Sequence, residues 1–284
     1  MGTGRSGTTI LEILLGNSPK ICGVGEAVHI FRDGLQARKM CACGEPPDQC
    51  PVWSAVWRDG GWAPGDADVL CETQKAFSWH SRFPQLFLGL ISRKSSRFFG
   101  QVNTSFINSA ARVTSSNVVI DSSKYAGRAL ALFRYRDGPM KVICITREPA
   151  GLIKAFARQT TEGEQLPKTP FKLLAYYVYT MTCLRLASLV LRDECRSITY
   201  EQLRSDPNAT LQEIGEWSGI DFSESCKILG CNGTLRPGHM VTGNRLRMNS
   251  SIRFKKSVSQ NAPLHGSARV AELLMRFWRG LLRF

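Results

Sequence analysis

The sequence predicts an α/β fold in which a parallel sheet lies between two layers of helices. Three observations predict it. Short β-branched runs indicate strands at residues 21–24, 118–120, 142–146 and 197–199. Helical patterns alternate with them at residues 8–15, 125–136, 149–158 and 171–192. Alternating strands and helices form parallel sheets through right-handed crossovers. No repeat or low-complexity linker interrupts the 284 residues, so we expect one domain spanning 1–284.

Composition places the chain among folded globular proteins and points to an anionic partner. Hydrophobic residues make up 43% of the chain and charged residues 21%, which excludes disorder, collagen and polytopic membrane proteins. The formal net charge is +14. A basic chain favours nucleic acid, an anionic membrane, a phosphate- or sulfate-bearing nucleotide, or an acidic glycan. The basic residues are spread out with no aromatic-and-basic module, so we expect no nucleic-acid partner.

The first predicted helix follows a glycine-rich loop, GTGRSGTT, that resembles an anion cradle. Its glycines let backbone N–H groups converge, its hydroxyls add donors, and the helix N-terminus adds a favourable dipole. The residues expected to contact the anion are Gly4, Arg5, Ser6, Gly7, Thr8 and Thr9. A nucleoside triphosphatase would carry a lysine where Thr8 stands. A kinase or triphosphatase is therefore disfavoured here but stays an alternative.

Charged residues follow the other predicted strands, where ligands of parallel sheets bind. Glu26 comes after the first run and is either a general base or a carboxylate that stabilises a helix start. Lys124 follows the second run and is either an oxyanion-binding residue or an ordinary surface lysine. Arg147 follows the third run, and its guanidinium suits bidentate phosphate binding. Together they predict a site along the carboxyl edge of the sheet.

Residues 226–262 are rich in Gly, Asn and Arg and predict a long loop. Long loops in compact domains are often binding loops or lids. We expect this one to cover a bound nucleotide with Gly243, Asn244, Arg245 and Arg247.

These segments resemble, in order, the sulfotransferases that use 3′-phosphoadenosine 5′-phosphosulfate (PAPS). GTGRSGTTILEILL is similar to their 5′-phosphosulfate loop, in the arginine-containing form of carbohydrate and bacterial members. KVICITREPAGLIKAF is similar to their 3′-phosphate segment. CGVGEA, CACGEPPDQCPVW, VVIDSSKYAGRAL, SITYEQLRSDPNATLQEIGEWSGI and GHMVTGNRLRMN are similar to further family segments.

The resemblance implies a fold like that of P-loop nucleoside triphosphate hydrolases and transfer of a sulfuryl group from PAPS to an acceptor hydroxyl. It implies catalytic roles for Arg5, Glu26 and Lys124, with His29 as a second candidate base. Asp121 is expected to order its loop through Ser6 or Thr9. Tyr200 and Glu201 are expected to be structural. PAPS is the only co-substrate implied, and no metal is expected.

Two departures from the family pattern leave a catalytically impaired fragment as an alternative. The family has a hydrophobic strand before the phosphate loop, whereas this sequence begins at Met1, so we expect the sheet to lack that strand. The family's 3′-phosphate serine corresponds to Ala155. Lys154 and Arg158 are the nearby residues that would supply charge there.

Acceptor, compartment and thiol state follow from weaker signals. The charge and the carbohydrate-type loop favour a glycan acceptor. Cys41, Cys43 and Cys50 fit a disulfide, a metal site or reduced thiols, of which reduced thiols are favoured. The bacterial-type cysteine segment favours the cytoplasm, while four Asn-x-Ser/Thr sequons leave the Golgi lumen open if an anchor is missing. Residues 173–191 fit a buried helix better than a membrane span. The basic amphipathic C-terminus predicts a docked helix, with peripheral membrane contact as the alternative.

Overall fold

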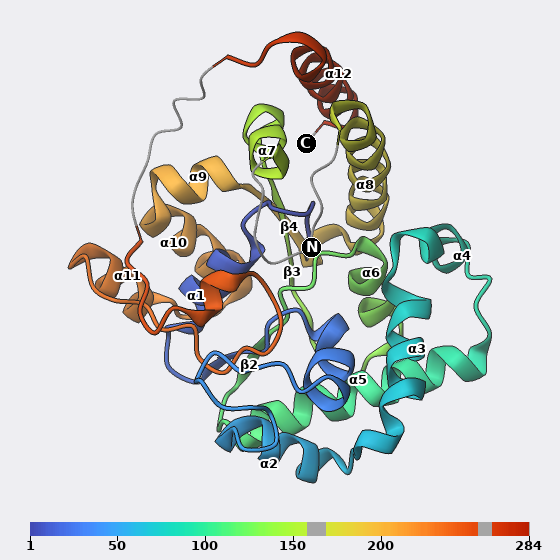
Figure 1. The fold of residues 1–284 in the computed structure, drawn as a ribbon, viewed down its shortest axis with the longest axis vertical. Coiled ribbons are helices and arrows are strands. Elements are labelled where there is room, and N and C mark those ends of the chain that lie inside the picture. Colours follow the sequence, from blue (N-terminus) through green and yellow to red (C-terminus); the bar gives the residue numbers. More distant parts are fainter. Residues whose placement is uncertain (158–168, 255–262, 284) are drawn as a thin grey trace.

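The computed structural model describes residues 1–157, 169–254 and 263–283, and its strands form where the β-branched runs predict them. Strand β1 (Ile21–Gly23) pairs in parallel with β2 (Val118–Ile120). Strand β3 (Val142–Thr146) pairs in parallel with β4 (Cys195–Thr199) (Figure 1). In this register Val142 is opposite Cys195. The α/β class and the parallel pairing are confirmed.

The prediction of one continuous sheet is wrong, because the four strands form two separate pairs, β1 with β2 and β3 with β4. Met1 and Gly2 lie between the pairs. The Met1 amino group donates to the Ile143 carbonyl at 2.6 Å, and Gly2 forms a parallel bridge with Ile145. On the other side, the Gly2 N–H donates to the Lys124 carbonyl at 2.9 Å. Met1 and the first residue of the glycine-rich loop are therefore fixed to β3, and Gly2 is also fixed to the segment that follows β2.

The predicted helices are present with small shifts at their ends. They are α1 (Thr8–Gly16), α6 (Ala126–Tyr135), α7 (Pro149–Ala157) and α8 (Pro170–Leu191). The remaining α-helices are α2 (Pro51–Gly60), α3 (Ala67–Ser78), α4 (Phe83–Phe87), α5 (Arg93–Val113), α9 (Tyr200–Ser205), α10 (Pro207–Ser218), α11 (Ser223–Gly230) and α12 (Gly266–Leu282).

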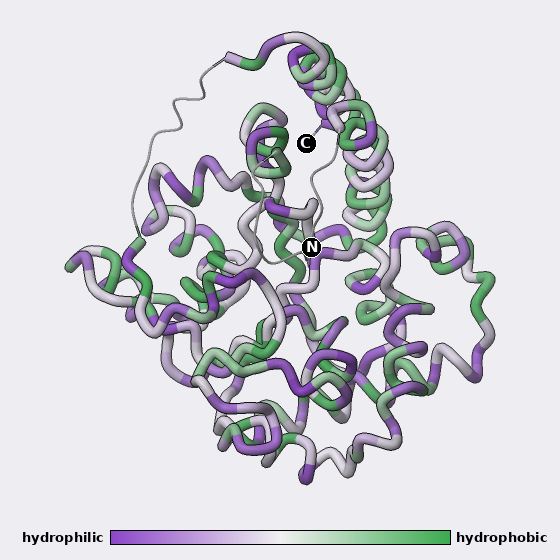
Figure 2. The backbone as a smooth tube through the Cα atoms, viewed as in Figure 1, coloured by the Kyte–Doolittle hydropathy of each residue, from purple (hydrophilic) through white to green (hydrophobic). Residues whose placement is uncertain are grey.

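The apolar core gathers around the strand pairs, where the tube of Figure 2 is green in β3, α1 and α6. Helix α8 contributes Met181 and Leu184, which are fully buried, and packs against α6 and α12. Helix α8 has the length and composition of a membrane span. Only 39% of this stretch is buried, so its contacts with α6 and α12 confirm the predicted buried helix only in part.

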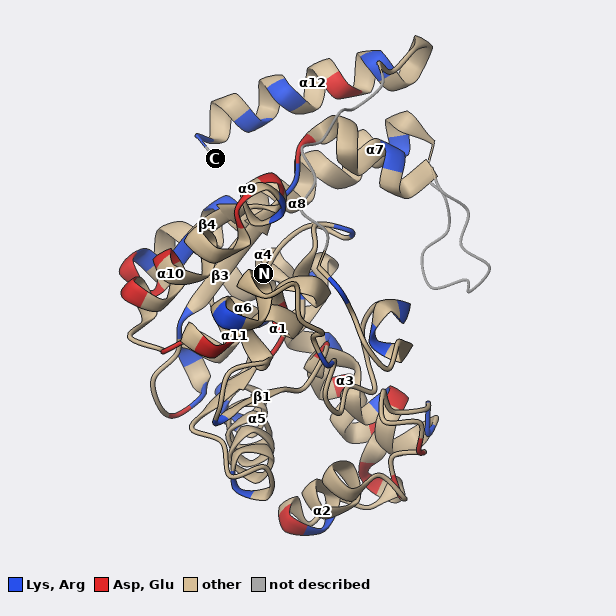
Figure 3. Ribbon diagram, turned by 90° about the vertical axis from the view of Figure 1, so that its left-hand side faces the viewer, with Lys and Arg blue, Asp and Glu red and all other residues tan. Residues whose placement is uncertain are grey.

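The C-terminal helix α12 docks on the rest of the chain, which confirms the predicted docked helix. Ala271 and Met275 are buried on its inner side against α8. Basic residues dominate its charged positions where it crosses α7 (Figure 3). Leu273, Leu274 and Phe277 are exposed on the outside. Membrane contact through this outer side stays a prediction.

A buried polar network fixes the loops that follow β1 and β2. Arg128 of α6, only 2% exposed, donates to Asp121 Oδ2 at 2.6 Å and to Asn103 Oδ1 at 3.0 Å. Asp121 Oδ1 accepts from the backbone N–H groups of Ser123 at 2.8 Å and Ala27 at 3.2 Å. Asp121 therefore orders its loop as expected, although its partners are not Ser6 or Thr9. The sequon at Asn103 is buried in this network.

Candidate active site

The glycine-rich loop makes a tight turn that requires glycine at position 7. Gly7 precedes α1 with φ of 100°, and a Cβ there would lie 2.4 Å from the Tyr200 ring. Arg5 has φ of 61°. The Gly4 N–H donates to the Tyr176 hydroxyl at 2.8 Å. The turn is thus held from two sides, by α8 and by α9. The Ser6 N–H donates to the Thr3 carbonyl at 3.3 Å within the turn, and Gly7, Thr8 and Thr9 at the start of α1 face the cavity.

The loop opens on a cavity of about 1070 Å³. The cavity contains most of the residues that the sequence predicts for the site. Those that line it are Gly4, Arg5, Gly7, Thr8, Thr9, Glu26, Lys124, Arg147, Gly243, Asn244 and Arg245. Ser6 does not line it, because its side chain is buried beneath the loop. Residues from five separate parts of the chain therefore meet at one place.

Positive charge dominates the cavity wall. Two carboxylates, those of Glu26 and Asp33, also line it. The basic side chains that line it are Arg5, Arg32, Lys39, Lys124, Arg147, Lys154, Arg204, Arg245 and Arg253. Burial, and then the nearby charge of Arg245, lower the pKa of Arg5. Such crowding of like charges is relieved when an anion binds, so the cavity is suited to a polyanionic ligand.

Arg147 lies directly beside the glycine-rich loop. Its Nη1 donates to the Arg5 carbonyl at 3.1 Å, and its guanidinium lies over the Tyr200 ring, 4.4 Å from the centroid. Tyr200, which we expected to be structural, also lines the cavity. Stacking on an aromatic ring fixes the plane of a guanidinium and so fixes the direction of its donors.

Glu26 and Lys124 form an ion pair on the cavity wall, and both side chains are largely buried. Glu26 stands at the N-cap of a short 3-10 helix, η1 (Ala27–His29). His29 lines the same cavity, where burial, and then the Arg32 charge, lower its pKa to about 4. Burial also lowers the pKa of His80, the other imidazole on this wall, to about 4, so both imidazoles are uncharged at neutral pH.

The described part of the predicted loop (residues 231–254, called the late loop below) covers the glycine-rich loop. One of its arginines does not face the cavity. The Asn244 N–H donates to Thr9 Oγ1 at 3.4 Å. Arg247 Nη1 instead donates to the carbonyls of Met40 at 2.8 Å and Met240 at 3.3 Å. Arg245 and Arg247 lie two residues apart in the 3-10 helix η6 (Arg245–Met248), so they project in different directions. Arg253, which was not predicted, lines the cavity.

The predicted loop 226–262 begins later than expected, because α11 continues to Gly230. Its residues 255–262 lie outside the described residues, as does Arg158. Lys154 and Ala155 both line the cavity, so a lysine is present where the family serine is absent.

The sequence analysis missed several cavity residues because they fall in predicted helical or apolar segments, including Tyr125, which begins the predicted helix 125–136. These residues are Trp79, His80, Tyr125, Tyr176 and Arg204. Most are aromatic residues inside apolar or helical patterns, where the sequence predicts core packing. Looking for charged residues after predicted strands identifies side chains at the edge of the sheet. It does not identify side chains that helices place above that edge.

A buried carboxyl group lies under Glu26 and was also missed. Glu12 of α1 is 1% exposed, and its Oε1 accepts from the Gly25 N–H at 2.6 Å. Burial raises its pKa to about 8. The sequence signal was the single acidic residue in the apolar run ILEILL. Glu12 is thus largely protonated at neutral pH and supports the backbone turn that positions Glu26.

The comparisons with known proteins show the fold. No family model and no curated protein matches the sequence. The solved structure "Sulfotransferase Domain from the Curacin Biosynthetic Pathway" aligns with 100% of this chain and 95% of its own, with 14% identity and a TM-score of 0.52. "Sulfotransferase Domain from the Synechococcus PCC 7002 Olefin Synthase" aligns with 98% of this chain and 92% of its own, with 14% identity and a TM-score of 0.45. The first likeness shows that this chain shares the fold of that domain.

The buried Glu12 predicts a specific pH dependence of stability. The folded state holds its proton up to about pH 8, whereas the unfolded chain releases it near 4.5. The contribution of Glu12 to the free energy of unfolding is therefore fully present below pH 4.5, and it is lost as the pH rises through about 8. Glu12→Gln, which mimics the protonated form, should raise the free energy of unfolding above wild type at alkaline pH by on the order of 2–4 kcal/mol.

Urea denaturation of wild type, Glu12→Gln and the exposed-site control Glu216→Gln at about pH 5 and pH 8.5 measures this difference. The control should not show it. A Glu12→Gln effect of equal size at both pH values would contradict a raised pKa.

Proposed function

We propose that this chain transfers the sulfuryl group of PAPS to an acceptor hydroxyl and releases adenosine 3′,5′-bisphosphate. One observation carries the proposal: the glycine-rich loop, Arg147 and the Glu26–Lys124 pair all open onto the same cavity. The sulfotransferase fold of the chain supports it, as does the ordered set of motifs. With it we propose a three-layer P-loop type of arrangement and one domain spanning the chain.

The donor would lie along the cationic wall. The N–H groups of the loop and the hydroxyls of Thr8 and Thr9 suit the 5′-phosphosulfate. Arg147, fixed on Tyr200, suits the 3′-phosphate as a bidentate donor. Gly243, Asn244 and Arg245 of the late loop would close over the nucleotide.

Sulfuryl transfer needs little covalent help from the protein, because positioning and charge neutralisation supply most of the catalysis, as in phosphoryl transfer. The acceptor oxygen forms a bond to sulfur as the bond from sulfur to the bridging phosphate oxygen breaks. Arg5 would neutralise the charge that develops on that oxygen. Glu26 would take the acceptor proton, and Lys124 would hold Glu26 in place and contact the sulfuryl oxygens. His29 is the alternative base.

The acceptor we propose is a carbohydrate hydroxyl. Trp79, His80 and Tyr125 line the cavity that also holds Glu26, and aromatic rings pack well against the apolar faces of sugars. The similar solved structure comes from the curacin pathway and is only 14% identical, so it does not indicate the acceptor of this chain. We also propose a cytoplasmic location, because the cysteine segment CACGEPPDQCPVW resembles that of bacterial-type members.

Removing the Arg5 guanidinium should abolish most of the transfer without unfolding the chain. Arg5→Ala takes away a charge that acts on the leaving group, so kcat should fall about 10²–10³-fold. The assay follows ³⁵S from labelled PAPS into a panel of sugar acceptors. Arg93→Ala, an exposed arginine remote from the cavity, is the matched control. Unchanged turnover in Arg5→Ala would remove Arg5 from the mechanism.

Glu26→Gln should separate chemistry from binding. The amide keeps the shape of the carboxylate but accepts no proton, so kcat should fall about 10²–10⁴-fold while the Kd for adenosine 3′,5′-bisphosphate changes little. Calorimetric titration and turnover measure the two effects. If the variant loses both nucleotide binding and thermal stability, Glu26 is a structural residue and His29 becomes the base to test.

A further inference from the structure

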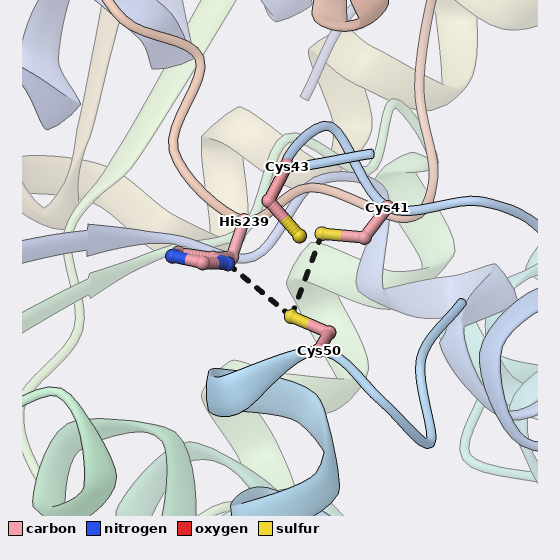
Figure 4. Close-up of side chains that lie close together, drawn as sticks. All are labelled: Cys41, Cys43, Cys50 and His239. Atoms are coloured by element: carbon pink, nitrogen blue, oxygen red, sulfur yellow. Dashed lines mark hydrogen bonds between the residues drawn. The ribbon is translucent and has the colours of Figure 1, made fainter. Parts of the chain in front are cut away.

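The structure gathers three cysteines and a histidine at a place that the proposed reaction does not use. Cys41 and Cys43 come from one short loop, Cys50 precedes α2, and His239 belongs to the late segment of the chain (Figure 4). Their ligand atoms all lie within 4.8 Å of one another. The sequence suggested only the three cysteines, because His239 is about 190 residues further along.

Local backbone geometry makes the two cysteines of the loop converge. The Gly44 N–H donates to the Cys41 carbonyl at 3.0 Å, and the Cys41 N–H donates to the Glu45 carbonyl at 2.9 Å. Gly44 has φ of 94°, which favours glycine and reverses the chain. As a result the Cys43 sulfur points back toward Cys41 (Figure 4).

The other two groups are fixed by contacts outside that loop. Cys50 is the N-cap of α2, so its sulfur lies at the positive end of a helix dipole, which stabilises a thiolate. His239 is held by its backbone, since Trp53 Nε1 donates to its carbonyl at 2.7 Å. Its Nδ1 lies 3.2 Å from Cys50 Sγ.

These distances match tetrahedral zinc rather than a disulfide. Zinc–sulfur bonds of about 2.3 Å place two bound sulfurs about 3.8 Å apart. Cys50 Sγ and Cys41 Sγ are 3.7 Å apart, whereas a disulfide bond is about 2 Å long. Three sulfurs and one imidazole nitrogen form one of the usual donor sets of structural zinc sites.

We propose that Cys41, Cys43, Cys50 and His239 bind one zinc ion with a structural role. Four protein ligands complete a tetrahedral shell, and none of the four lines the active-site cavity. The ion would therefore have no open position for substrate, which is the property that separates structural zinc from catalytic zinc.

The zinc would join the cysteine segment to the late loop that covers the active site. The Ala42 N–H donates to the Met240 carbonyl at 2.9 Å, beside His239. Arg247 spans the same two segments through Met40 and Met240. Thr242, two residues after Met240, lies close against the backbone of Gly25. A Cβ added to Gly25 would be only 2.4 Å from the Thr242 carbonyl oxygen. The metal would thus hold the start of the late loop against the backbone next to Glu26.

Metal analysis of the intact chain tests the proposal directly and does not depend on any activity. Purified under reducing conditions with zinc in the medium, the protein should contain about one zinc per chain, and Cys43→Ser should contain less than roughly a tenth of that. Cys231→Ser, another exposed cysteine, is the matched control and should keep its zinc. Replacement of zinc by Co²⁺ should give the visible bands of tetrahedral thiolate coordination.

A second measurement follows the late loop. Removal of zinc by a chelator should speed amide hydrogen exchange in residues 239–248 and leave α5 unchanged. Substoichiometric zinc in the wild type, equal zinc in wild type and Cys43→Ser, or a mass showing a Cys41–Cys50 disulfide would each overturn the proposal. A zinc-containing protein without sulfuryl transfer would overturn the proposed function and leave this site intact.

Discussion

The structure depends on the convergence of positive charge and backbone donors on one turn of the chain. The glycine-rich loop starts between the two strand pairs, where Gly2 is bonded to both sides. From there its N–H groups and Arg5 face a wall of further cations, among them Arg147 and Arg245. Like charges so close together are costly unless an anion lies between them. An anionic ligand of this cavity would therefore also stabilise the folded chain.

Most of the framework around that turn was predictable because it follows local patterns. The β-branched runs became strands, and the loop became the start of α1, since both depend on neighbouring residues alone. Residues at strand ends, such as Glu26, Lys124 and Arg147, meet in the cavity because parallel strands end at one edge.

What the sequence could not show depends on contacts between distant segments. Tyr176 reaches the loop from the apolar helix α8, and Tyr200 lies under Arg147 from α9. Arg247 turned away from the cavity because the short helix η6 directs it to backbone carbonyls instead. His239 joins three cysteines only because the late loop folds over the first quarter of the chain. None of these pairings has a local signature.

The crystal structure of the chain with adenosine 3′,5′-bisphosphate is the most direct test of the account. We expect the 5′-phosphate within hydrogen-bonding distance of the N–H groups of Gly7, Thr8 and Thr9 and the 3′-phosphate on the Arg147 guanidinium. A nucleotide bound outside this cavity, or one with its two phosphates in exchanged positions, would contradict the assignment of the loop as the donor site.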